Sequence, residues 1–392
     1  MTDLEANPDE LTCPAPSARP QPALERYAAR EVPLGGIRAA KVLRTLPHRE
    51  LPTVGAWCFL DSFAPGDPPM NVLPHPHIGL QTVTWPLSGQ MRHRDTLGSD
   101  QILRPGELNV MTSGDGVAHS EWMVDEHGES GLQLWVALPE SARHVPAAFE
   151  HISNLPVVIN RGVKVTVFVG EHDGVASPAR VHSPLVGLEI EIDSGVQFDL
   201  PLRPEFEYAV LVTANALTIE GEELTHASGD LLYLGGDRSS VRLSAAHRPA
   251  RLTVLGGEPL AEDLVMWWNF VGRSHEDVTP APTGRTAIGG RRASASCRGM
   301  AMPSFLRPRC PTFASRRVVG GAWVRRGPHP MLGGRDNPTP KTPGNPGSRA
   351  RYCGEDDVST IEETPDMTTL SDRLTTAGAV ATDASRPDLE RV

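Results

Sequence analysis

The chain has 392 residues, of which 39% are hydrophobic, and its formal net charge is -11. This length is sufficient to bury more than one core, and the negative charge argues against a general affinity for nucleic acid, whose phosphates need a positive surface. No apolar stretch is long enough to cross a bilayer, the first residues are polar, and the five cysteines contain no C-x-x-C pair. We therefore expect a cytoplasmic protein that does not use a membrane.

The sequence pattern predicts an all-β protein with two domains, both of which alternate short apolar runs with turn signals. Residues 1–28 are rich in Pro and Ala, and we predict a disordered lead-in there. Over residues 29–150, short apolar runs such as VGAWCFLDSF and GLQLWVALP alternate with turn signals such as SGDG. The same rhythm returns over residues 160–278, for example in LVGLEIEID. Many short strands joined by turns are typical of β-barrels and sandwiches.

Helical periodicity is weak, so we expect only a few short helices, near residues 139–148 and 262–270. Beyond residue 278 the composition shifts to Arg, Gly, Pro, Ala and Ser, and no hydrophobic period survives. Such a segment cannot bury a core. We therefore predict that residues 279–392 form a disordered tail.

Two pairs of polar residues carry the chemistry of the first domain. His75 and His77 are two residues apart, as are His119 and Glu121. Residues i and i+2 of a strand point to the same face, so each pair can direct two side chains into a barrel. Three imidazoles and one carboxylate around a point suit Fe(II), Mn, Ni or Zn and leave positions open for water or substrate.

The competing interpretation is that these are ordinary surface histidines. With 14 histidines in the chain, one H-x-H pair arises by chance at about even odds. Three features favour a metal site: the HPH pair precedes an apolar strand and a turn glycine, a G-x-x-H spacing with a carboxylate follows about forty residues later, and a PGE turn lies between them. His93 and Asp95 form a further pair two residues apart on an expected strand. These side chains either contact the ligands or lie on the surface in water, and the sequence favours neither interpretation.

Five motifs in a fixed order give a more specific indication. HPHIGLQTVTW, GQMRHRDTLGS, RPGELNVMTSGDGVAHSE, GLQLWVALP and MWWNFVGRSHEDV together closely resemble the pirin family of bicupins. The resemblance covers about residues 30–278. It implies two tandem cupin barrels, each a double-stranded β-helix, of which the first binds iron and the second has lost its metal ligands.

By this resemblance, one Fe(II), or another divalent metal such as Mn, Ni, Zn or Cu, is held by His75, His77, His119 and Glu121. After His151 no H-x-H pair occurs, in keeping with a metal-free second barrel. Many pirins read HPHRGFET, whereas here Ile78 and Gln81 replace an Arg and a Glu. Ile78 removes a positive charge beside the metal. A family role that depends on a basic surface there is therefore not expected of this chain.

The resemblance leaves two functions open, since both need the same ligands. Several pirins are quercetin 2,3-dioxygenases, which open a flavonol ring with O2 and release carbon monoxide. This reading, which we favour, implies an oxidoreductase with a flavonol-like aromatic substrate, in which Glu121 is also catalytic as the base that takes the substrate proton. Other pirins are non-catalytic, redox-sensitive partners of transcription factors or metabolic enzymes, which implies a protein partner. In either case we expect a monomer.

The tail departs from the family pattern, and the departure indicates a shift of the reading frame in the gene. Pirins usually continue with a stretch resembling RADW and then RFG-x-V-x-G-Y, and neither is present. The codons of Ala293–Pro303, read one base earlier, permit RFGVVPGYGDA, and the same shift over Ala281–Gly284 permits RADW. Our hypothesis is that the reading frame slips near Val278 and that residues 279–392 are out-of-frame translation.

Overall fold

The computed structural model describes residues 10–16, 20–34, 40–64, 71–124 and 128–279, and these are nearly all β. They form twenty-six strands and one short α-helix, which confirms the all-β prediction. No helix in these ranges is long and apolar enough to span a membrane. The predicted tail, residues 279–392, lies outside the described residues except for Thr279.

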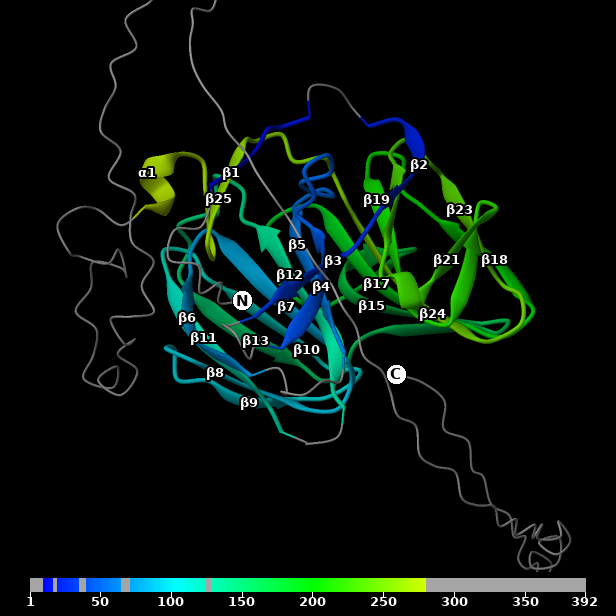
Figure 1. Cartoon of the computed structure of the whole chain (residues 1–392), viewed down its shortest axis with the longest axis horizontal. Coiled ribbons are helices and arrows are strands. Elements are labelled where there is room, and N and C mark those ends of the chain that lie inside the picture. Colours follow the sequence, from blue (N-terminus) through cyan, green and yellow to red (C-terminus); the bar gives the residue numbers. More distant parts are fainter. Residues whose placement is uncertain (1–9, 17–19, 35–39, 65–70, 125–127, 280–392) are drawn as a thin grey trace, which may run out of the picture. The chain divides into compact units, whose positions relative to one another are not determined.

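The first barrel consists of two antiparallel sheets, drawn in blue to teal in Figure 1. The larger sheet has the strand order β13-β10-β7-β12-β5-β4-β3, and the smaller has the order β6-β11-β8-β9. A hydrogen bond from Thr84 on β7 to Glu121 on β11 joins the inner faces of the two sheets. The strands are β3 (Arg30–Pro33), β4 (Lys41–Leu46), β5 (Trp57–Phe63), β6 (Val72–His77), β7 (Leu80–Ser88), β8 (Met91–Asp95), β9 (Asp100–Leu103), β10 (Leu108–Thr112), β11 (Val117–Met123), β12 (Ser130–Ala137) and β13 (Ala148–Ile152).

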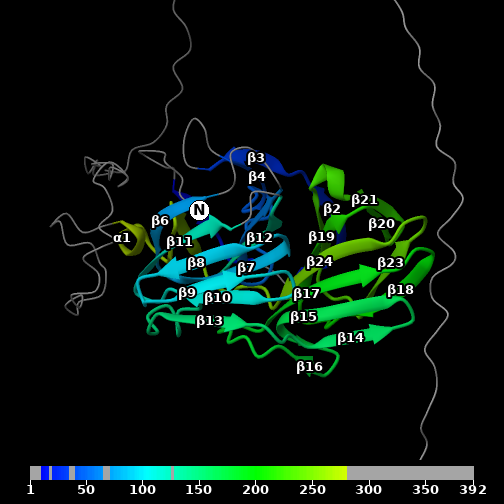
Figure 2. The ribbon, with the colours of Figure 1, turned by 90° about the horizontal axis from the view of Figure 1, so that it is seen from below.

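The second barrel repeats this plan with a different interior. Its larger sheet has the order β14-β15-β17-β24-β19-β22-β2, and its smaller sheet has the order β18-β23-β20-β21. In Figure 2 the strands of both sheets are green to yellow-green, except for β2, which is dark blue. Aliphatic side chains such as Val167, Leu188 and Val254 fill the interior. Its strands are β14 (Val157–Asn160), β15 (Val163–His172), β16 (Val175–Ala176), β17 (Leu185–Ile192), β18 (Val196–Pro201), β19 (Glu207–Ala214), β20 (Ala216–Ile219), β21 (Glu222–Thr225), β22 (Leu231–Gly235), β23 (Ser240–Ala245) and β24 (Ala250–Gly257).

Strands from the two ends of the described chain cross between the barrels. Strand β2 (Pro22–Tyr27) pairs with β22 of the second barrel, and β1 (Leu11–Cys13) pairs with β25 (Leu264–Trp267), which pairs with β26 (Phe270–Gly272). Residues 1–28 were expected to lack structure, yet the described residues 10–16 and 20–28 contribute two strands. The prolines of this segment suggested disorder, but β2 is an edge strand, where a missing N–H is tolerated. Tyr27, at the end of β2, is buried.

The two predicted short helices are wrong. Residues 139–145 form turns, and β13 begins at Ala148. The second segment is the β25–β26 hairpin, whose turn includes Trp268 at φ 55°. All four residues of β25 are buried, so both of its faces are covered and its sequence shows no alternation. The α-helix α1 (His275–Val278) follows, with a capping box between Ser274 and Asp277.

One hydrophobic core cluster runs through both barrels. The indole of Trp85 stacks on Phe168 with ring centroids 5.1 Å apart, and its Nε1 donates to Glu189 at 2.7 Å. Farther along the junction, Glu207 accepts from the Gly55 amide and from the Tyr233 hydroxyl, both at 2.6 Å. Apolar packing around hydrogen-bonded carboxyl groups is the construction of a domain interior, so the junction contributes to stability.

Candidate metal centre

The four predicted ligands lie on two neighbouring strands of the smaller sheet in the first barrel. Strand β6 carries His75 and His77, and β11 carries His119 and Glu121, all on the inner face and all buried. His119 lies opposite His75, and a register irregularity follows it, so that Glu121 lies opposite Val72. The alternation inferred from the sequence thus places each pair inside the barrel.

The three imidazoles converge through the same ring nitrogen. His119 Nε2 is 3.1 Å from His75 Nε2 and 3.1 Å from His77 Nε2. On the far side of two of these rings, His75 Nδ1 contacts the Leu73 carbonyl at 2.8 Å and His77 Nδ1 contacts the Asn269 carbonyl at 3.1 Å. A carbonyl oxygen only accepts, so both Nδ1 atoms carry the hydrogen and both Nε2 atoms present lone pairs.

This donor set fits a metal ion. Burial lowers the pKa of each of the three histidines well below its ordinary value, so the rings are neutral, as ligands must be. Lone pairs that face one another in a buried site repel unless a cation lies between them. Nitrogens 3.1 Å apart match neighbouring ligands of an octahedron with bonds of about 2.2 Å, close to the metal–imidazole distances found in proteins.

Glu121 lies in a second, overlapping group of side chains. The candidate ligand atoms of His75, His77 and His119 all lie within 4.8 Å of one another. The same holds for a second group, His93, His119 and Glu121, which shares His119 with the first. The Thr84 hydroxyl donates to Glu121 Oε1 at 3.0 Å and is itself 3.2 Å from Gln133 Oε1. Burial raises the pKa of Glu121, so this carboxylate holds a proton more readily than an exposed one.

The structure adds two groups that sequence reasoning left undecided or missed. His93 is buried beside His119, and the pair that it forms with Asp95 was one of two open interpretations. Asn269 supplies its carbonyl to His77 from the β25–β26 hairpin, 192 residues away in the chain. A backbone acceptor carries no residue-type signal, so no motif could have indicated it.

The hairpin is docked directly against the ligand strand. Phe270 forms an isolated bridge with Ile78, and the Val271 amide donates to the Ile78 carbonyl at 3.1 Å. Gly79 has φ 71°, and a Cβ atom on it would lie 1.9 Å from the Val271 carbonyl oxygen. Only glycine permits this approach.

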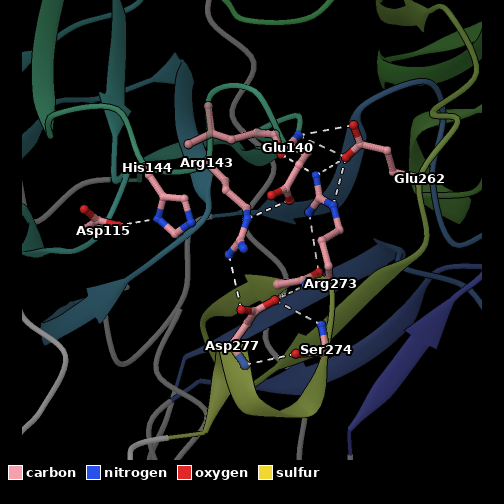
Figure 3. A network of polar contacts seen from close by, with 10 residues as sticks. Asp115, Glu140, Arg143, His144, Glu262, Arg273, Ser274 and Asp277 are labelled. Carbon is pink, nitrogen blue, oxygen red and sulfur yellow. Dashed lines mark hydrogen bonds and ion pairs between the residues drawn. The ribbon is translucent and has the colours of Figure 1, made fainter.

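One ion pair and several hydrogen bonds fasten the segments that flank the hairpin to the first barrel (Figure 3). Arg273 Nε donates to Glu262 at 2.8 Å, and its guanidinium also reaches the Leu138 carbonyl at 2.7 Å. Arg143, from the turns after β12, lies 3.3 Å from Asp277 of α1. These contacts hold the hairpin, and with it the Asn269 carbonyl, in place behind His77.

Comparison with known proteins agrees with this architecture. The Pirin family model matches residues 36–136, and the Pirin C-terminal cupin domain model matches residues 187–283. A Pseudomonas aeruginosa protein named "Putative quercetin 2,3-dioxygenase" is 40% identical over 285 residues, which cover 71% of this chain and 87% of that protein. A "Pirin-like protein" of Caulobacter vibrioides is 35% identical over 268 residues, 65% of this chain and 90% of its own length.

A solved structure supports the same assignment. The crystal structure of a quercetin 2,3-dioxygenase from Acinetobacter baumannii is 36% identical in sequence, with a TM-score of 0.61 over 65% of this chain and 85% of the other. Two cupin barrels in one chain, the first with a cluster of inward histidines, define a bicupin. The chain belongs to the pirin family.

Proposed function

We propose that the first barrel holds one divalent iron through His75, His77, His119 and Glu121, and that the protein is an oxidoreductase of the quercetin 2,3-dioxygenase type. The observation that carries the proposal is the convergence of buried, neutral imidazoles on one point beside a buried carboxylate. The dioxygenase names of the relatives from P. aeruginosa and A. baumannii support a flavonol as substrate and O2 as co-substrate. A bound iron would supply open coordination positions and the capacity to exchange single electrons with substrate and O2.

Glu121 is suited to accept the proton of a flavonol hydroxyl. Its pKa is raised by burial, which brings its proton affinity closer to that of a weakly acidic hydroxyl. The Thr84 hydroxyl, donating to Oε1, fixes the carboxylate toward the barrel interior. Gln133 completes this arrangement when its amide is oriented to donate to the Thr84 oxygen, since a hydroxyl has only one hydrogen to give.

The site is buried among aromatic side chains. The Trp135 ring packs edge-on against His77 with centroids 5.2 Å apart, and Phe149 lies parallel to His93 at 4.4 Å. In such an apolar setting the charges of Glu121 and of a deprotonated substrate are poorly screened. Their interactions with a cation are therefore stronger than in water.

The test is O2 consumption by iron-loaded protein with quercetin, measured with an oxygen electrode and by release of carbon monoxide. Wild type should turn over, and Glu121→Gln should lose at least roughly a hundredfold in kcat, the usual contribution of a general base, while its fold is kept. Glu107→Gln, a partly exposed carboxylate of the same barrel, serves as the matched control and should retain activity. An iron-loaded wild type that consumes no O2 with quercetin would contradict the proposal and favour a non-catalytic, partner-binding role. An unchanged rate in metal-loaded Glu121→Gln would remove Glu121 as the base.

A further inference from the structure

His93 and Asp95 lie on the inner face of β8, next to the ligand strand. His93 lies opposite Glu121 in the register of β8 and β11, and Asp95 lies opposite His119. Both side chains are buried, and the His93 ring stacks on Phe149 with an interplanar angle of 15°. The pair therefore faces the metal centre rather than solvent.

The contacts of Asp95 determine which nitrogen of His93 carries the hydrogen. Asp95 Oδ1 accepts from the amides of Leu97 and Ser99, at 2.9 and 3.0 Å, and Oδ2 is 3.2 Å from His93 Nε2. An ionised carboxylate only accepts, so His93 Nε2 is the donor in this contact. In the neutral ring, His93 Nδ1 is then left with a lone pair.

This lone pair faces the third imidazole of the cluster. His93 Nδ1 is 3.4 Å from His119 Nδ1, the nitrogen on the side of the ring opposite to His75 and His77. His119 Nδ1 consequently carries the hydrogen and donates to His93. Its Nε2 then presents a lone pair to the same point as those of the other two histidines.

The position of His119 in the sheet explains why a side chain takes this role. The backbone carbonyl of Leu73, on the edge strand β6, accepts from His75. The carbonyl of Asn269, in the hairpin, accepts from His77. Strand β11 lies between β6 and β8, with its backbone paired on both sides. Backbone acceptors there are used by the sheet, so the acceptor for His119 must come from a side chain on a neighbouring strand.

We propose that Asp95 and His93 form a hydrogen-bond relay that fixes the tautomer and orientation of His119, which makes His93 a positioning residue of the metal centre. The inference rests on the metal site of the proposed function. The competing role is that His93 is itself a ligand, in the group with His119 and Glu121. The geometry disfavours this role, because His93 Nε2 is occupied by Asp95 and its Nδ1 faces the side of His119 that is turned away from the other two imidazoles.

Tautomers are directly measurable in the metal-free protein. Long-range 1H–15N spectra of protein labelled with 15N-histidine should show Nδ1–H on His75, His77 and His119 and Nε2–H on His93, with each signal assigned by its single His→Gln variant. In Asp95→Ala, His93 should become a mixture of tautomers. A wild-type His93 that carries its hydrogen on Nδ1 overturns the relay, whatever metal the protein binds.

The metal titration separates a positioning role from ligation. His93→Phe keeps a ring to stack on Phe149 but removes the acceptor, and it should weaken Fe(II) affinity by roughly 10- to 100-fold, the usual effect of losing such a partner. His93→Gln restores an acceptor and should recover most of the loss. His151→Phe, a partly exposed histidine of the same barrel, is the control and should bind as wild type does.

X-ray absorption and thermal unfolding complete the assay. The number of nitrogen ligands should be the same in His93→Phe as in wild type, and the metal-free variant should unfold close to the wild-type temperature. A count lower by one makes His93 a ligand, and an unchanged affinity, or equal losses in the Phe and Gln variants, also overturns the proposal. A wild type that binds no metal refutes the proposed function instead, while the tautomer measurement still decides the relay.

Discussion

Gly79→Ala is the most incisive perturbation of the metal centre that does not touch a ligand. A methyl group at Gly79 would overlap the Val271 carbonyl and force the β25–β26 hairpin away from β6. The φ of 71° costs an alanine about 1–2 kcal/mol. Displacement of the hairpin endangers two hydrogen bonds, from Val271 to Ile78 and from His77 to Asn269, each worth about 1 kcal/mol net. The expected loss in the free energy of unfolding is therefore about 3–4 kcal/mol.

Gly106→Ala separates the backbone effect from the displacement. Gly106 has φ 84°, but a Cβ atom there would meet no atom within 4 Å, so only the conformational cost of about 1–2 kcal/mol is expected. Urea unfolding of the metal-free proteins gives both differences. Fe(II) titration should show affinity reduced roughly tenfold in Gly79→Ala, because His77 loses its acceptor, and unchanged in Gly106→Ala. Equal stability and equal affinity in the two variants would refute the reasoning.

Three further predictions address the site, the junction and the gene. Elemental analysis should find roughly one metal per chain in wild type and in His151→Ala but little in His119→Ala, since a mononuclear site rarely survives the loss of a ligand; full loading of His119→Ala would contradict the ligand set. Burial raises the pKa of Glu207 above the ordinary 4.5, so the folded state keeps its proton to higher pH than the unfolded chain, and stability falls as pH rises from about 4.5 through the folded pKa. Urea unfolding across that interval should show a shallower fall in Glu207→Gln, and parallel curves would exclude this carboxyl as the source. Resequencing the gene around the codon of Val278 should reveal a shifted frame; a continuous frame together with a protease-resistant tail in the intact protein would remove that hypothesis.

The parts of the centre that follow from local rules were accessible from sequence. Strand alternation alone places His75 with His77, and His119 with Glu121, on inner faces, and turn signals are sufficient for the all-β class. The contact of His93 with His119 depends instead on the pairing of β8 with β11, which a single sequence does not specify.

Other features were concealed by composition or by tertiary context. Strand β2 lies at the edge of its sheet, where prolines are tolerated, and the Pro-rich composition of this segment resembles that of an unstructured one. Nevertheless, Tyr27 packs against Tyr233. The run from Leu264 to Trp267 is apolar throughout, and such a run does not distinguish a buried strand from a short helix. In both places burial by distant segments overrides the local signal.

The crossing of strands between the barrels has a consequence for how this architecture can be divided. A fragment ending at the linker after β13 would keep every proposed ligand of the metal, yet it would lack Asn269, whose carbonyl orients His77. The second barrel, in turn, borrows β2 from a segment that precedes the first. Neither half is therefore complete by itself. Recombination at the linker would separate the proposed ligands from the hairpin that orients His77, so the two barrels have to be inherited together.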